Sequence, residues 1–165
     1  MSVSKITEVR QYLTFKLEEE TFALDVGKVR EILDYTNITK VPQTPEFMKG
    51  VINLRGSVVP VVDMRLKFNM SRQERTVDTC IIVVEIVIDS DATVLGALVD
   101  SVQEVFELEP SQVEPPPRIG AKLSTEFIQG MGKRDDQFVI ILDIDKVFSS
   151  EELEIAQNMR GDNAV

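Results

Sequence analysis

The sequence predicts a mostly β protein, built from two small, closed or partly closed barrels that share an apolar seam and followed by one C-terminal helix. Apolar residues recur with a period of two in short runs, which is typical of strands. The same succession of runs occurs twice, and each half has only about 75 residues, a size that suits a small barrel. Because so small a half buries little core alone, we expect the two halves to pack together.

Four hairpins account for most of the alternating runs. Their paired segments are 12–17 with 21–24, 51–54 with 57–62, 79–88 with 92–99, and 127–132 with 138–144. The segment 26–33 fits a strand or a helix equally well. Only 150–158 has a clear helical pattern, with Ser149 or Ser150 as N-cap and two glutamates in its first turn.

An internal duplication is the strongest regularity in the chain. EFMKG at 46–50 matches EFIQG at 126–130, and VVPVVDM at 58–64 matches FVIILDI at 138–144, both at an offset of 80. Upstream, VGKVRE at 26–31 resembles VDSVQE at 99–104 at an offset of 73. We therefore expect related halves at about 11–70 and 78–148 within one domain spanning 11–165. The ends, 1–10 and 159–165, are expected to be flexible.

Composition excludes several classes of function. A net charge of -10 argues against binding nucleic acid or anionic membrane surfaces. The chain has no histidine, so it lacks the commonest general base and metal ligand, and no phosphate-binding or nucleophile motif is present. Its longest apolar run, 80–88, is too short to cross a membrane, and the single cysteine inside it, Cys80, is expected to be buried. We expect a soluble, cytoplasmic protein without metal, cofactor or catalytic residues.

Residues that recur in both halves are expected to be architectural. Asp63 recurs as Asp143, each after an apolar strand, where a carboxylate accepts hydrogen bonds from backbone N–H groups. Gly50 recurs as Gly130, each before a strand, where close packing or an unusual backbone conformation requires glycine.

The turn from Asn53 to Gly56 differs from its counterpart. The sequence NLRG stands where the second half has KRDD, which we interpret as an ordinary polar turn. Arginine pairs with carboxylates through two parallel hydrogen bonds. Arg55 therefore either forms an internal ion pair, with Glu31 as the favoured partner, or contacts another protein, and the two roles are compatible.

The chain resembles a known family. The stretch GVINLRGSVVPVVDMRLKF at 50–68, with VREIL at 29–33 and VPQTPEF at 41–47, is similar to the CheW family of bacterial chemotaxis coupling proteins. The second half fits as well, through GALVDSVQEV at 96–105 and LSTEFIQG at 123–130. The resemblance covers about 11–158 and implies two five-stranded, SH3-like barrel subdomains.

The resemblance implies a non-enzymatic scaffold that is recruited to membrane-bound receptor arrays without inserting into the membrane. It would couple the cytoplasmic tips of methyl-accepting chemoreceptors to the regulatory domain of the histidine kinase CheA, and it could also contact itself in rings. The receptor-facing groove would involve Val29, Glu31, Gly50, Asn53, Arg55, Val102 and Val105. Kinase contacts would lie at Val58, Arg118 and Ile119. For the three groove valines, burial in the core is the alternative reading.

Two other functions stay open. Asp63 and Asp143 could in principle act as a pair of catalytic carboxylates, as in a glycoside hydrolase, although the duplication already explains them. An SH3-like module could instead bind proline-rich peptides, but such sites need an aromatic surface. The chain has no tryptophan and only two tyrosines, Tyr12 and Tyr35, which disfavours that reading.

Overall fold

A computed structural model describes residues 9–72, 74–88, 90–115 and 126–159. Within these ranges the strands are β1 (Arg10–Leu17), β2 (Glu20–Asp25), β3 (Val29–Asp34), β4 (Met48–Leu54), β5 (Ser57–Asp63), β6 (Cys80–Ile88), β7 (Asp91–Val99), β8 (Ser101–Leu108), β9 (Val113–Glu114), β10 (Ile128–Arg134) and β11 (Gln137–Leu142). The α-helices are α1 (Met64–Lys67) and α2 (Ser150–Met159), and the 3₁₀ turns are η1 (Val26–Lys28), η2 (Pro110–Gln112) and η3 (Ile144–Lys146). The ambiguous segment 26–33 is thus a 3₁₀ turn followed by a strand.

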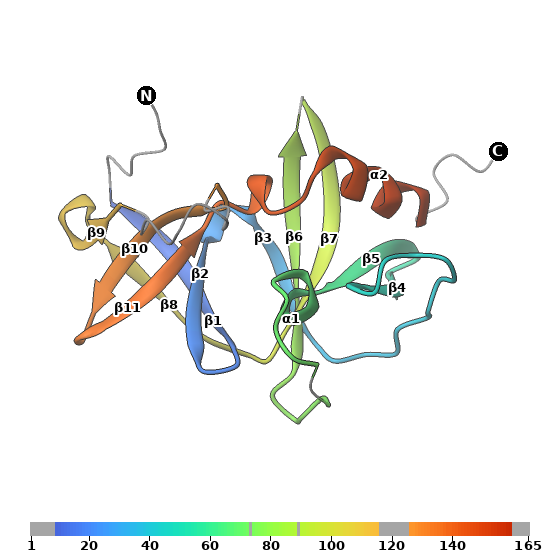
Figure 1. Cartoon of the computed structure of the whole chain (residues 1–165), viewed down its shortest axis with the longest axis horizontal. Coiled ribbons are helices and arrows are strands. Elements are labelled where there is room, and N and C mark those ends of the chain that lie inside the picture. The colour runs from blue at the N-terminus through green and yellow to red at the C-terminus, as the bar shows by residue number, and fades with distance from the viewer. Residues whose placement is uncertain (1–8, 73, 89, 116–125, 160–165) are drawn as a thin grey trace.

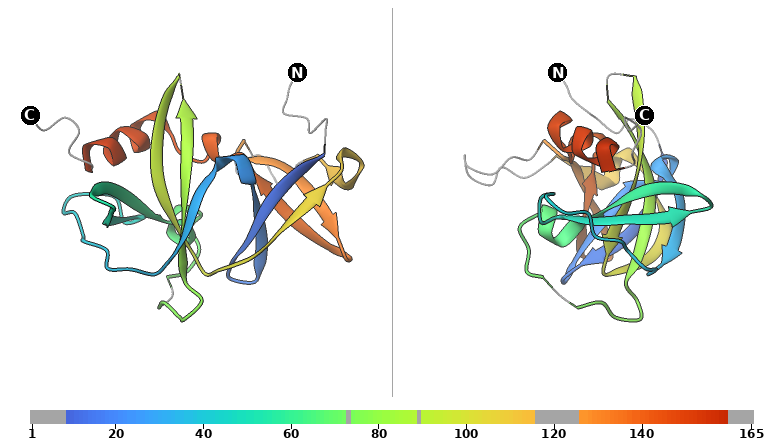
Figure 2. Two further views of the ribbon diagram at one scale, coloured as in Figure 1. Left: turned by 180° about the vertical axis from the view of Figure 1, so that it is seen from behind. Right: turned by 90° about the vertical axis from the view of Figure 1, so that its right-hand side faces the viewer.

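The strands form two sheets that make up two lobes (Figure 1). The six-stranded lobe has the order β8-β1-β2-β11-β10-β9, and the five-stranded lobe has the order β3-β6-β7-β5-β4. Helix α2 lies across the top of the five-stranded lobe, beside the long β6–β7 hairpin (Figures 1 and 2). The expected fold class is confirmed: mostly β, two subdomains and a C-terminal helix, with the two-residue β9 as an additional strand.

Each lobe combines strands from both parts of the chain. Strands β1 and β2 belong to the first half of the chain and pair with β8 and β11 of the second half. Strands β3, β4 and β5 of the first half form the other sheet with β6 and β7 of the second half. The chain crosses between the lobes at η1 and again at Asp100, between β7 and β8. The strand pairing therefore divides the chain differently from the two consecutive halves that the sequence predicted.

The two sheets nevertheless share one topology. Read from β8 and from β3, each sheet has two antiparallel pairs, one parallel pair and a further antiparallel pair. Strands β4 and β10 carry the same irregularity, between Met48 and Gly50 and between Ile128 and Gly130. The outer edge of each is covered by a short pairing, Thr39 with Val51 and β9 with β10. The duplicated halves thus exchange strands reciprocally within one molecule.

Three apolar clusters form the core. One lies inside the six-stranded lobe and includes Tyr12, Phe106 and Ile141, and a second lies inside the five-stranded lobe around Ile81. The third and largest combines residues of both lobes and α2, and it is the predicted seam. Strand β1 contributes to the interior of the six-stranded lobe and to the seam from its two faces: Tyr12 belongs to the lobe interior, and its neighbour Leu13 belongs to the seam.

Four stacked phenylalanines run through the seam. Ring centroids are 5.7 Å apart for Phe15 and Phe22, 6.0 Å for Phe22 and Phe68, and 5.1 Å for Phe68 and Phe127. Cys80 is buried in the same cluster, as expected. None of the helices in the described ranges is long and apolar enough to cross a membrane.

Candidate functional site

An apolar strip extends from the seam toward the surface on strands β3 and β8. Val29 and Ile32 of β3 lie opposite seam residues of β6, and Val102 and Val105 of β8 lie opposite seam residues of β1. Val29 and Val102 are half-buried against the seam, whereas Ile32 is 46% exposed and Val105 is 52% exposed. We call these four residues the interlobe strip.

Ile32 is the member of the strip that sequence reasoning missed. It stands 73 residues before Val105, the offset that already relates Val29 to Val102. The duplication therefore contained the signal. The single-sequence pattern concealed it, because 26–33 fitted two kinds of secondary structure.

Arg55 forms the predicted ion pair with Glu31. Its Nη1 lies 2.7 Å from Glu31 Oε1 and its Nη2 lies 2.9 Å from Oε2, so both oxygens are engaged. These hydrogen bonds lower the pKa of Glu31 and raise the pKa of Arg55. The Arg55 side chain remains 73% exposed and the Glu31 side chain 27% exposed. The pair joins the β4–β5 turn to β3, the strand at the opposite end of the sheet order, and it leaves the guanidinium accessible to another protein.

The other two groove residues of the first half serve the backbone. The Asn53 side chain accepts a hydrogen bond at 2.8 Å from the Gly56 N–H, within a turn where Arg55 has a φ of 53° and Gly56 has a φ of 89°. Positive φ at both central residues is typical of a type I′ hairpin. Gly50 is buried, and a Cβ there would lie 2.1 Å from the Thr39 carbonyl oxygen. Its position is therefore set by packing rather than by surface chemistry.

The second half has an equivalent ion pair, which corrects the reading of KRDD as an ordinary turn. Arg134 Nη1 lies 2.9 Å from Glu104 Oε2, and the guanidinium stacks 4.3 Å above the Phe106 ring. Glu104 is the duplicate of Glu31, and Arg134 is one residue away from the position that matches Arg55. Each lobe thus has an arginine–glutamate pair whose glutamate lies on a strand of the interlobe strip, β3 or β8.

Only one of the three expected kinase-contact residues lies in the described ranges. Val58 is 41% exposed at the start of β5. Its duplicate, Phe138, is 51% exposed at the equivalent place on β11. Arg118 and Ile119 lie outside the described residues.

The recurring aspartates each precede a helical turn, and only Asp63 caps it with its side chain. Asp63 precedes α1 and its Oδ1 accepts the Leu66 N–H at 3.2 Å, as the duplication predicted. Asp143 precedes η3, where burial raises its pKa. Asp63 ends β5 and Asp143 follows β11, the equivalent strand of the other lobe, so the duplication explains the recurrence without a catalytic role. The described ranges contain no group of three or more histidine, cysteine or acidic side chains that could hold a metal ion.

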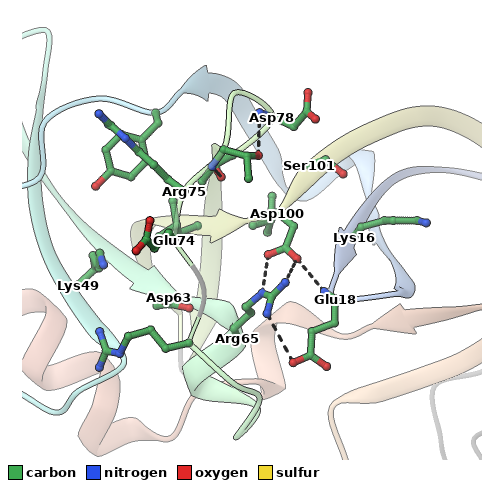
Figure 3. A pocket seen from close by; sticks show the side chains of 16 residues that line it. Lys16, Glu18, Lys49, Asp63, Arg65, Glu74, Arg75, Asp78, Asp100 and Ser101 are labelled. Carbon is green, nitrogen blue, oxygen red and sulfur yellow. Dashed lines mark hydrogen bonds and ion pairs between the residues drawn. The ribbon is translucent and has the colours of Figure 1, made fainter.

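A charged pocket of about 640 Å³ opens between the lobes near α1 (Figure 3). Arg65 extends from its wall, and its Nε donates to Asp100 Oδ1 at 2.8 Å. The side chain is only 10% exposed and also contacts Glu18 and the Ser71 carbonyl. Its charge is thus satisfied within the protein.

A protein-family model of the CheW-like domain matches residues 11–152, most of the chain. The chain belongs to the CheW family. It is 37% identical to the chemotaxis protein CheW of Klebsiella aerogenes over 164 residues, covering 96% of this chain and 95% of that protein. It is 33% identical to the CheW of Rhizobium meliloti, covering 89% and 92%.

Structural comparison agrees. The crystal structure of the scaffolding protein TtCheW from Thermoanaerobacter tengcongensis superposes with a TM-score of 0.76 at 36% identity, covering 87% of this chain and 94% of that one. The family resemblance seen in the sequence is confirmed, and with it the two-subdomain fold on which the interlobe strip depends.

Proposed function

We propose that this protein is a chemotaxis scaffold that performs no catalysis and couples methyl-accepting chemoreceptors to the histidine kinase CheA. The observation that carries the proposal is the interlobe strip, with the Arg55–Glu31 pair on the other face of β3, in a chain of the CheW family. A scaffold acts by holding two partners in a fixed orientation, and the continuous seam between the lobes suits that task.

The strip is the proposed receptor-binding surface. A helical receptor tip presents apolar residues at intervals of three and four, which an apolar surface between two lobes can accept. Valine and isoleucine have few rotamers, so ordering them on binding costs little conformational entropy. Arg55 keeps most of its surface exposed while Glu31 holds its orientation, so it can add a hydrogen bond to a polar or acidic group on the receptor.

The proposed kinase contact of the first half, Val58, pairs with Asn53 across the β4–β5 hairpin. Val58 is an exposed apolar residue at the β4–β5 end of the five-stranded lobe, and with Arg118 and Ile119 it remains the proposed contact with the CheA regulatory domain. Weak contacts of this kind would add up in an array, where each molecule has several neighbours.

The test is co-sedimentation with receptor-bearing membranes, with and without CheA. Arg55→Ala should reduce sedimentation with receptors at least about tenfold, because it removes the accessible guanidinium of the proposed receptor site. Val58→Glu should leave sedimentation with receptors unchanged and reduce the CheA recovered with it. Arg72→Ala, which removes another exposed arginine ion-paired to Glu46, is the matched control and should behave like the wild type.

Circular dichroism and thermal unfolding must first show that each variant is folded. Full ternary assembly by folded Arg55→Ala would contradict the assigned receptor surface. Because the Arg55–Glu31 pair is exposed and screened by solvent, it contributes little to stability and the variant should fold.

A further inference from the structure

The two parts of this duplicated chain carry very different charge. Residues 1–72 contain 11 basic and 9 acidic side chains, a net charge of +2. Residues 73–165 contain 7 basic and 19 acidic side chains, a net charge of -12. The chain's total of -10 therefore comes from its second part. We call these parts the N-part and the C-part.

Ion pairs between the N-part and the C-part all have one polarity. Within the described ranges four pairs join the two parts, and in each the cation belongs to the N-part and the anion to the C-part. They are Lys28–Asp145, Arg30–Glu85, Arg65–Asp100 and Lys67–Glu152. The other ion pairs of the described residues lie within one part and show no such separation of charge.

The Arg65 pair ties the β7–β8 crossover to both lobes (Figure 3). Arg65 lies in α1, after the five-stranded lobe's β5, and engages both oxygens of Asp100. Asp100 in turn accepts the Glu18 N–H at 2.8 Å and donates its own N–H to the Lys16 carbonyl at 3.0 Å, both at the β1–β2 turn of the six-stranded lobe. With Arg65 only 10% exposed, this pair is shielded from solvent screening.

The Lys28 pair resembles the Arg65 pair with its charges exchanged, and Lys28 is one residue away from the position that matches Asp100. Asp145 is the duplicate of Arg65 at the offset of 80, and it follows β11 as Arg65 follows β5. Its Oδ2 lies 2.7 Å from Nζ of Lys28, at the β2–β3 crossover, and its Oδ1 accepts the Val87 N–H at 2.9 Å near the β6–β7 turn. Both crossovers are thus fixed by a cation of the N-part and an anion of the C-part.

This arrangement discriminates between possible pairings. Because the two parts have the same topology and exchange strands, an N-part could pair with the N-part of a second chain, as in a domain-swapped dimer. Such a pairing would bring Lys28 to Arg65, and two paired C-parts would bring Asp100 to Asp145. Like charges repel at both crossovers in those pairings, whereas only N-part with C-part gives attraction at both.

We infer that the uniform polarity of these ion pairs makes the N-part select the C-part and reject a second copy of itself, so that the duplicated chain closes as a monomer. The inference is independent of the receptor and kinase assignments. It concerns which segments of this protein recognise one another, and its partner surface is the complementary part of the same fold.

Charge reversal in the full chain tests it. The first variant reverses the N-part with Lys28→Asp and Arg30→Glu, and the second reverses the C-part with Glu85→Arg and Asp145→Lys. All four side chains are partly exposed, so the changes bury no new charge. A third chain carries all four substitutions, and Lys28→Gln with Arg30→Gln is the neutral control. Each protein is refolded alone, and the first two variants are also refolded as an equimolar mixture. The concentration is millimolar, so that pairing between two chains can compete with pairing inside one chain.

Each single-part reversal should lower Tm by about 5 °C or more beyond the neutral control, and the fourfold variant should be more stable than either reversal, although Asp145→Lys still lacks the acceptor for the Val87 N–H. The refolded mixture should contain a 1:1 dimer by native mass spectrometry and light scattering, while the wild type refolds as a monomer. A fourfold variant no more stable than the single-part reversals would overturn the inference. So would a mixture that yields no more mixed dimer than wild type refolded in the same way.

Discussion

Asp63 and Asp143 show how one duplicated residue can acquire two electrostatic environments. Both follow the equivalent strand of their lobe and both precede a helical turn. Asp63 accepts a backbone N–H at the start of α1. The pKa of Asp143 is raised, chiefly by burial, which disfavours the charged form, although Lys146 and the Asp145 N–H act in the opposite direction. Only Asp63 caps its helical turn with a side-chain hydrogen bond, so the two surroundings give the same residue different roles.

Asp143→Asn should stabilise the protein at neutral pH. Because the folded-state pKa is above the ordinary value of 3.8, the unfolded chain loses the proton first, so stability falls as pH rises through the interval between the two values. The amide removes that loss and can still accept a hydrogen bond. Thermal unfolding of variant and wild type checks this, measured between pH 3 and 7 at intervals of roughly one pH unit. The gain should vanish below the ordinary pKa, and a gain that is constant with pH would contradict the assignment.

Among the elements, β4 and β10 are shaped by their glycines. A Cβ on Gly50 would meet the Thr39 carbonyl oxygen at 2.1 Å, and a Cβ on Gly130 would meet Val113 Cγ1 at 2.6 Å and the Glu114 carbonyl oxygen at 3.0 Å. In both lobes the glycine lets a short segment pair closely with the outer edge of the strand. Covering that edge limits its pairing with other chains.

Gly50→Ala should therefore destabilise the protein by about 2–3 kcal/mol, because the backbone carbonyl cannot move away cheaply. Urea unfolding measures the change. Gly56→Ala is the matched control, since a Cβ there meets nothing within 4 Å and only its φ of +89° is unfavourable. That control should cost about 1–2 kcal/mol. A Gly50 variant as stable as the wild type would show that Thr39 does not hold the edge in place.

At the scale of the whole molecule, the seam makes the two lobes one cooperative unit. The seam cluster contains buried residues from both sheets and from α2, and two chain crossovers connect the lobes. The five-stranded lobe consists of the consecutive strands β3 to β7, whereas the six-stranded lobe combines β1 and β2 with β8 to β11 and so needs both ends of the chain. A scaffold benefits, because the angle between its binding surfaces is fixed by packed side chains rather than by a linker.

Phe68→Ala should lower stability by about 3 kcal/mol without separating the unfolding of the lobes. Phe68 stacks on Phe22 and Phe127 in the seam, so its loss weakens both lobes together. Thermal unfolding followed by far-UV and near-UV circular dichroism should give coincident single transitions. Phe138→Ala, at an exposed position, should stay within about 0.5 kcal/mol of the wild type. Two resolved transitions in the Phe68 variant would contradict a shared core.

Local pairing was predictable and long-range pairing was not. The four hairpins follow from alternation and turn residues, and Ser149 forms the expected N-cap with Glu152. Strand β8 was not predicted as an element, and β3 was left ambiguous, because both bend at an irregular register where they pass between the lobes. Ile32 was missed because of that ambiguity in 26–33, and the Arg134–Glu104 pair was missed because it joins β10 to β8, which are distant in sequence.

The sequence by itself determined the duplication, the hairpins, the Arg55–Glu31 pair and the family. These depend on neighbours in the chain, on turn chemistry, or on motifs long enough to be distinctive. Only the tertiary structure decided that each lobe takes strands from both halves, and that Arg65–Asp100 and Lys28–Asp145 fix the crossovers. The reason is physical: an alternating strand specifies which face is buried but not which strand lies beside it, and that choice is made by packing and charge across the whole molecule.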